Sequence, residues 1–162
     1  MEGYTYVLVT DATASNFDAS ARRICVNFDS SAFVADQELV EALEKCSTPV
    51  DCDEDRNLFI QGETPVGLYI VREGDVALSM ASPSGDEIMR ASAPAGSVLG
   101  LPGLLSSQPY TLTAKAKRGS RLSFVTGEDF SRLMLNSPEL SMLVLRVLAA
   151  EVRTARRVLC ED

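Results

Sequence analysis

Residues 97–114 read SVLGLPGLLSSQPYTLTA and carry two glycines, two prolines and no charged side chain. The uncharged run extends from Ala91 to Ala114, in a chain whose formal net charge is −8. Glycine and proline interrupt this stretch too often for a core helix, and it is too long and irregular for a simple turn. We therefore expect an irregular connection, whose role depends on the elements on either side of it.

Short segments with a period-two pattern surround this connection. From Asn57 to about residue 126, six or seven segments of this kind alternate with turns of Gly, Pro, Ser and Asp. Turn signals at this spacing are typical of an antiparallel sandwich or barrel. Residues 82–87 (SPSGDE) predict a hairpin loop in which Gly85 takes a positive φ. The predicted fold class is mainly β with flanking helices, an antiparallel, jelly-roll-like β-roll followed by a long C-terminal helix.

Helical patterns flank the predicted roll on both sides. Residues 36–46 (DQELVEALEKC) predict a helix with Asp36 as its N-cap. After the roll, residues 127–135 predict a short amphipathic helix. The sequence Ser-Pro-Glu at 137–139 predicts the start of a long helix that continues without a breaker to Leu159.

Apolar residues of the long helix recur at spacings of three and four, which is the pattern of a coiled-coil seam. A second apolar stripe in its first half can face the roll. The helix could pack only on its own domain, or it could pack on the roll and also pair with a second copy. We favour the second interpretation, which predicts a homodimer with an interface formed by Leu145, Leu148, Val152, Ala155 and Leu159.

The composition excludes several kinds of chemistry. The chain has no histidine, so Ser-His or Cys-His nucleophile pairs and His-ligated metals are impossible. Asp51, Asp53 and Asp55 have the spacing that opens an EF-hand loop, but Arg56 and Gly62 stand where that loop needs Gly and Glu. With no P-loop and no distinctive carboxylate pair, we expect a protein that is not an enzyme and that carries no metal or cofactor.

The charge balance and the cysteines indicate which partners the protein can bind and in which cellular compartment it lies. The 23 acidic residues against 15 basic ones argue against a general nucleic-acid surface. The first residues show no signal peptide, and no apolar run approaches the ~20 residues of a membrane helix. The four cysteines form no C-x-x-C pair and are expected to be reduced thiols. We expect a cytoplasmic protein without membrane contact.

The order of helix, β-roll, short helix and long helix, over about residues 36–159, resembles the cyclic-nucleotide-binding domain of bacterial Crp/Fnr-type regulators. The Gly-Glu pair at 62–63 and Gly74 match positions at the start of that family's roll. The family's phosphate-binding cassette has a glycine and a proline nine residues apart, and Gly100 and Pro109 have this spacing. The resemblance implies a regulatory domain with a small-molecule site at the cassette.

Two residues that would contact the ligand differ from the family pattern. Leu101 replaces the glutamate that holds the ribose 2′-hydroxyl, and Tyr110 replaces the arginine that pairs with the cyclic phosphate. Losing both contacts should cost on the order of several kcal/mol, so we expect weak or no binding of cAMP and cGMP. The resemblance implies a ligand site formed by Leu99, Gly100, Leu101, Gly103, Leu104, Tyr110 and Thr111.

Three interpretations of this site stay open. The pocket could take an apolar or weakly polar ligand, with the Tyr110 hydroxyl as a polar contact. It could be filled by its own side chains, leaving a scaffold that acts through protein contacts. It could also bind a cyclic nucleotide in an unusual pose, with Arg72, Arg90 or Lys115 as the cation.

The domain organisation follows from the same pattern. We expect residues 1–35 to be an N-terminal extension with short strands at 4–9 and 23–28, and residues 36–162 to be the domain. The roll should cover about 57–126 and the C-terminal helices about 127–160. Since no recognition helix follows the long helix, we expect no direct DNA binding by this chain.

Overall fold

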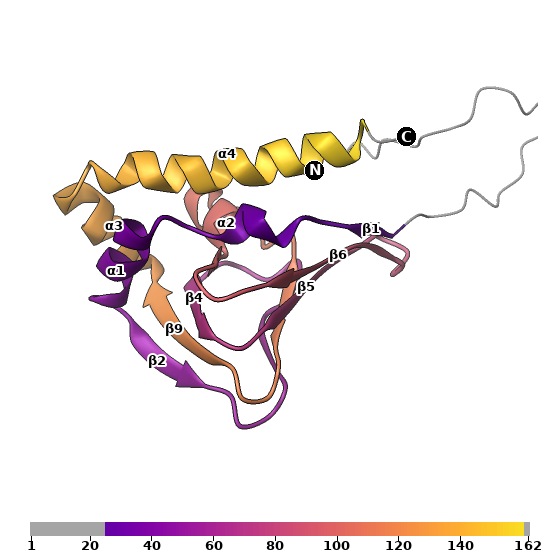
Figure 1. The fold of residues 1–162 in the computed structure, drawn as a ribbon, viewed down its shortest axis with the longest axis horizontal. Helices are drawn as coiled ribbons and strands as arrows, with labels where there is room; N and C mark the ends of the chain where they lie inside the picture. Colours follow the sequence, from indigo (N-terminus) through magenta and orange to yellow (C-terminus); the bar gives the residue numbers. More distant parts are fainter. Residues whose placement is uncertain (1–24, 161–162) are drawn as a thin grey trace, which may run out of the picture.

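Two sheets form the body of the molecule in the computed structural model, which describes residues 25–160 (Figure 1). One sheet has the strand order β1-β6-β5-β8-β3 and the other β2-β9-β4-β7. In these orders the strands are β1 (Val26–Asn27), β6 (Glu87–Ala93), β5 (Val76–Ala81), β8 (Thr113–Ala116) and β3 (Arg56–Phe59), then β2 (Thr48–Asp51), β9 (Arg121–Thr126), β4 (Gly67–Glu73) and β7 (Val98–Leu99).

The antiparallel pairs are nested along the chain. The hairpin β5–β6 lies at the centre, and around it β4 pairs with β7 and β9, β3 with β8, and β2 with β9. β1 differs, because it pairs with β6 in the parallel direction. The inner faces of both sheets share one core cluster, which includes Val71 and Leu122 from one sheet and Val76 and Leu78 from the other.

Helices cover one side of the roll. They are the 3₁₀ helix η1 (Ser30–Phe33), α1 (Gln37–Glu44), α2 (Leu101–Ser106), α3 (Gly127–Asn136) and α4 (Leu140–Val158). α4 lies across the molecule above η1 and α2 (Figure 1). A second core cluster joins helices to the sheet that contains β4 and β9, with Leu39, Phe130 and Val144 on the helices and Ile70 and Val125 on the strands.

The predicted fold class is confirmed: the structure is a mainly β roll with a long C-terminal helix. The hairpin loop at 82–87 is also confirmed, with Gly85 at φ +89°. The start of the long helix is two residues later than expected. Ser137 ends α3, and the Leu140 amide donates to the Ser137 carbonyl, so Pro138 lies in a turn between two helices.

The domain boundary expected at residue 36 stays a prediction, but the described part of the expected extension packs on the roll. β1 belongs to a sheet of the roll, and Phe33 is 3 % exposed in the core. An aromatic side chain buried to this degree contributes to the stability of the roll. The strand expected at residues 4–9 lies outside the described residues.

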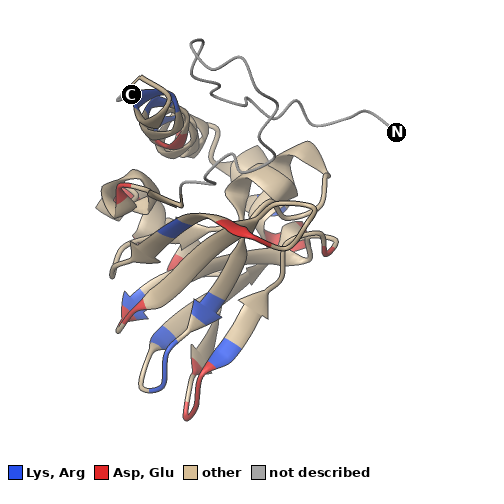
Figure 2. Ribbon diagram, turned by 90° about the vertical axis from the view of Figure 1, so that its right-hand side faces the viewer, with Lys and Arg blue, Asp and Glu red and all other residues tan. Residues whose placement is uncertain are grey.

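Charged residues lie mainly at hairpins, strand ends and helix surfaces (Figure 2). The acidic segment after β2 is part of this pattern, since Asp51 pairs with Arg121 and the Asp55 carboxylate accepts from the Arg118 amide. Among residues 25–160, no group of three or more His, Cys, Asp or Glu could hold a metal ion. Within the same range, no helix has the length and hydropathy to cross a bilayer.

Candidate functional site

The cassette folds as a short strand, a left-handed residue and a one-and-a-half-turn helix. β7 ends at Leu99, Gly100 takes φ +98°, and α2 follows. A side chain at Gly100 would be strained and crowded, because its Cβ would lie 3.2 Å from the Gly67 carbonyl oxygen and 3.3 Å from Tyr110 Cε1. The glycine therefore allows the cassette backbone to approach both β4 and the ring of Tyr110.

Tyr110 is held inside the roll by both its hydroxyl and its ring. The hydroxyl donates to the Gly67 carbonyl over 2.7 Å and accepts from the Val66 amide over 3.3 Å. The ring stacks on Phe59, with the centroids 4.2 Å apart and the planes 18° from parallel. Only 4 % of Tyr110 is exposed. The residue at the family's arginine position is thus a core residue with satisfied polar atoms.

The two motifs that carry the resemblance are joined through the backbone. The Gly62 amide donates to the Tyr110 carbonyl over 2.8 Å, and the Tyr110 amide donates to the Glu63 carbonyl over 3.0 Å. The Glu63 carboxylate accepts from the Ile60 amide and closes the adjacent turn. Positions 62–63 and Tyr110 therefore form one structural unit, even though they are far apart in sequence.

The remaining cavity is small, with a volume of ≈ 30 Å³. That space suits one or two water molecules, whereas sites for small organic ligands commonly measure about 300–1,000 Å³. It lies between the roll, α2 and α4, and is lined by Phe33, Phe59, Leu78, Leu99, Gly100, Pro102, Gly103, Tyr110, Thr111, Leu112 and Glu151.

The expected site residues are divided between two environments. Five of the seven line the cavity, namely Leu99, Gly100, Gly103, Tyr110 and Thr111. Leu101 and Leu104 do not line it, contrary to the expectation, because they point into the core cluster between the helices and β4. Leu101 is fully buried there. Successive positions of a helix are about 100° apart around its axis, so only part of the cassette can face the cavity.

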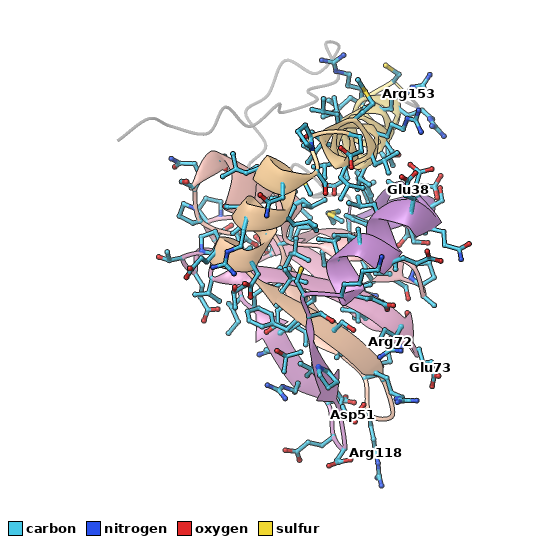
Figure 3. The ribbon with its side chains drawn as sticks, turned by 90° about the vertical axis from the view of Figure 1, so that its left-hand side faces the viewer. Glu38, Asp51, Arg72, Glu73, Arg118 and Arg153 are labelled. Atoms are coloured by element: carbon cyan, nitrogen blue, oxygen red, sulfur yellow. The ribbon has the colours of Figure 1, made fainter. Side chains whose placement is uncertain are left out.

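No lysine or arginine among the described residues lines the cavity. Arg72 pairs with Glu44 over 3.3 Å and lies beside Glu73 away from α4 (Figure 3). Arg90 pairs with Glu87, and Lys115 is exposed on β8. The three cations considered as substitutes for the cassette arginine are therefore placed elsewhere.

Of the described residues that line the cavity, Glu151 is the one that is charged, and the sequence alone did not indicate it. It lies on the inner stripe of α4, between Val147 and Thr154, which are both buried. Burial disfavours the charged carboxylate and raises the pKa of Glu151 to about 7. The spacing of three and four with its apolar neighbours was the available signal, because it places an acid within a stripe that faces the protein.

The outer face of α4 carries the predicted seam. Leu145, Val152 and Leu159 are 55 %, 48 % and 59 % exposed, and Ala155 is exposed beside them. Leu148 is half-buried because it also packs against the core between the helices and β4. Large apolar side chains that align along a helix and stay open to solvent mark a surface that can bind a partner.

The roll, the cassette and the long helix together define a class of ligand-sensing regulatory domains. Residues 50–137, more than half of the chain, match the sequence profile of the cyclic nucleotide-binding domain. The chain belongs to the cyclic nucleotide-binding domain family. A comparison with curated proteins found no match.

Solved structures share this fold. The catabolite activator protein of Thermus thermophilus superposes with a TM-score of 0.68 at 24 % identity, over 76 % of this chain and 58 % of that one. The N-terminal domain of a transcriptional regulator from Streptomyces coelicolor has a TM-score of 0.58 at 27 % identity, over 78 % and 88 %. The sensor domain of the regulator DNR from Pseudomonas aeruginosa has a TM-score of 0.58 at 21 % identity, over 77 % and 82 %. This chain thus corresponds to little more than half the length of the Thermus protein.

Proposed function

We propose that this chain is a non-catalytic regulatory domain that acts as a homodimer through α4 and binds cAMP and cGMP weakly or not at all. The observation that carries the proposal is the position of Tyr110. It fills the interior where the family's arginine would meet a phosphate, and its own polar atoms are already paired.

Electrostatics supports the same conclusion about the ligand. A cyclic phosphate would enter a cavity to which residues 25–160 contribute one charged residue, Glu151, and no cation. A bidentate arginine contact is about twice as strong as a neutral hydrogen bond, and a carboxylate opposite a phosphate adds repulsion. The unusual-pose alternative has less support, because Arg72 and Arg90 are engaged in other ion pairs.

The small cavity favours a filled scaffold over a site for a replacement ligand. Phe59 and Tyr110 occupy the interior by stacking, so a ligand larger than about two water molecules would have to displace a side chain or α4. In the scaffold interpretation, the roll positions α4, and the signal leaves through contacts with other proteins.

The proposal also includes the oligomeric state of the protein, its lack of direct DNA contact and its cellular location. The exposed seam of α4 supports pairing of two copies. The acidic net charge of −8 supports a role without direct DNA contact by this chain. We place the protein in the cytoplasm, where its four cysteines would stay reduced.

A thermal-unfolding titration with cAMP, cGMP and cyclic dinucleotides tests the ligand part. A ligand at a concentration of 100 times its dissociation constant adds about 2.7 kcal/mol to the free energy of unfolding, so tight binding would raise the unfolding temperature measurably. We expect no shift with millimolar cAMP or cGMP. The variant Tyr110→Arg restores the missing cation and should gain a salt-sensitive shift with cAMP. A clear shift of the unmodified protein with cAMP would contradict the proposal.

A further inference from the structure

Glu151 and Arg156 are charged residues of α4 that form no ion pair with any of residues 25–160. Among the described residues, neither takes part in a hydrogen bond or an ion pair, whereas most other arginines of the roll and of α3 do. Glu151 lies on the side of α4 that faces the cavity, and Arg156 is exposed. A half-buried carboxylate without a partner is costly, which raises the question of what neutralises it.

The predicted seam places these residues at complementary positions. With Leu145, Val152 and Leu159 at heptad position a, and Leu148 and Ala155 at d, Glu151 occupies position g and Arg156 position e. The alternative seam, with Leu145 and Val152 at d, would put Arg156 in the apolar centre, so the first assignment is favoured. Positions e and g flank the apolar contact and form the ion pairs between paired helices.

In a parallel pair of helices, a g residue faces the e residue five positions further along the other helix. Arg156 stands five residues after Glu151. In a two-fold dimer this contact occurs twice, because residue i meets residue j and j meets i. We propose that, in a parallel dimer through α4, Glu151 of each subunit binds Arg156 of the partner subunit.

This pairing would link the dimer to the cavity. Glu151 lines the cavity together with Phe33 and Thr111, so Arg156 of the partner subunit would reach the edge of the cavity. The cation that the cassette lacks would then come from the second copy, and the cavity would be closed by a salt bridge. This inference rests on the proposed homodimer and adds the ion pair that joins its two subunits.

Charge reversal tests the pair, with the dimer dissociation constant measured by sedimentation. Arg156→Glu alone and Glu151→Arg alone should each raise that constant about fivefold or more, because like charges then meet twice. The double variant restores opposite charges and should return to within about threefold of the unmodified protein. Arg153→Glu is the matched control: Arg153 is at position b and extends from α4 away from the sheets (Figure 3), so it should change the constant less than about twofold.

The pH dependence gives a second readout that does not need Glu151→Arg to fold. Within the described part of the chain, the other residues that line the cavity come from η1, β3, β5, β7, α2 and residues 100 and 110–112 and are uncharged at pH 6–8, so Glu151 is the group among them that titrates in this range. Its carboxylate must be ionised to bind Arg156 of the partner subunit. The dimer should therefore tighten between pH 6 and pH 8, and in Arg156→Glu this trend should reverse.

The outcomes separate the two proposals. A monomer at all concentrations would overturn both the homodimer and this pairing. A dimer in which the effects of the two reversals simply add, or in which Arg156→Glu changes nothing, would overturn the pairing alone and leave the proposed regulatory dimer in place.

Discussion

Gly100 and Tyr110 depend on each other, although the family pattern assigns them separate roles. The glycine lets the cassette backbone pass over the tyrosine ring, and the ring fills the space that a nucleotide would need. A residue such as Tyr110 at a binding position can thus preserve the backbone structure around a site while it removes the group that would bind the ligand. The match of Gly100 and Pro109 to the family's spacing therefore indicates the fold more reliably than it indicates the ligand.

Replacing Gly100 by alanine should destabilise the domain more than the same change at Gly62. Both residues have positive φ, +98° and +93°, so both variants carry backbone strain of about 1 kcal/mol. Only at position 100 does the new Cβ meet close neighbours, whereas the space around Gly62 is open. We expect a total loss of about 2–3 kcal/mol for Gly100→Ala. Urea unfolding of both variants measures the difference, and equal losses would contradict the crowding argument.

At the scale of single elements, α4 has two faces with different partners. Its inner stripe, with Leu140, Val144 and Val147, belongs to the core between the helices and β4 and includes one acid, Glu151. The same helix contacts η1 and α1. Its outer stripe is apolar and exposed. A helix of this kind can report on both the roll and a second copy, because a shift toward one changes its contacts with the other.

Glu151 should make the stability of the monomer fall as the pH rises. Its pKa lies near 7 in the folded chain and near the ordinary 4.5 when unfolded. Below pH 4.5 it is neutral in both states, and from there to about pH 7 the unfolded state increasingly gains by ionising. Glu151→Gln should remove this slope and add on the order of 2 kcal/mol at pH 8. Urea unfolding between pH 5 and 8, at concentrations that favour the monomer, measures it.

The control for this prediction is Glu139→Gln, which changes an exposed acid just before α4. It should leave the slope of stability against pH unchanged. An equal slope in the unmodified protein and in Glu151→Gln would show that the carboxylate is solvated in both states.

Elements with a strong periodic pattern could be predicted from the sequence, and those held by tertiary contacts could not. The hairpin at Gly85 and the helices after the roll have clear local signals. β2 does not, because its residues include Pro49 and it gains strand structure only by pairing with β9 at the edge of a sheet. Likewise, the start of α4 was misjudged because Ser137 ends α3 instead of capping the next helix.

The sequence indicated where a cassette could lie, but not which of its side chains face the cavity. At the position that the spacing of Gly100 and Pro109 indicated, the structure has a short strand, a left-handed glycine and a short helix. Whether Leu101 faces the cavity or the core between the helices and β4 depends on how α2 is rotated, which the sequence of a six-residue helix does not specify. Glu151 lies about fifty residues from the cassette, and only the packing of α4 brings it to the cavity.

For the whole molecule, the proposed mode of action is a rigid roll that presents a helix. Tyr110, Phe59 and the backbone bonds between positions 62–63 and 110 hold the interior without a ligand. If a nucleotide is not needed to order the roll, the domain is always in the form that pairs. Its activity would then depend on the protein concentration and on the ionisation of Glu151 more than on the concentration of a second messenger.

The nested order of the strands also has a consequence for folding during synthesis on the ribosome. β2 can pair with β9 only after about seventy further residues have been synthesised. The separation between β1 and its partner β6 is almost as long. The β5–β6 hairpin has both its strands at once, and its loop closes at little entropic cost. The roll should therefore assemble from its middle outward, with hydrogen-exchange protection appearing in β5 and β6 first during refolding and in β2 last. Protection of β2 ahead of the central hairpin would exclude this order.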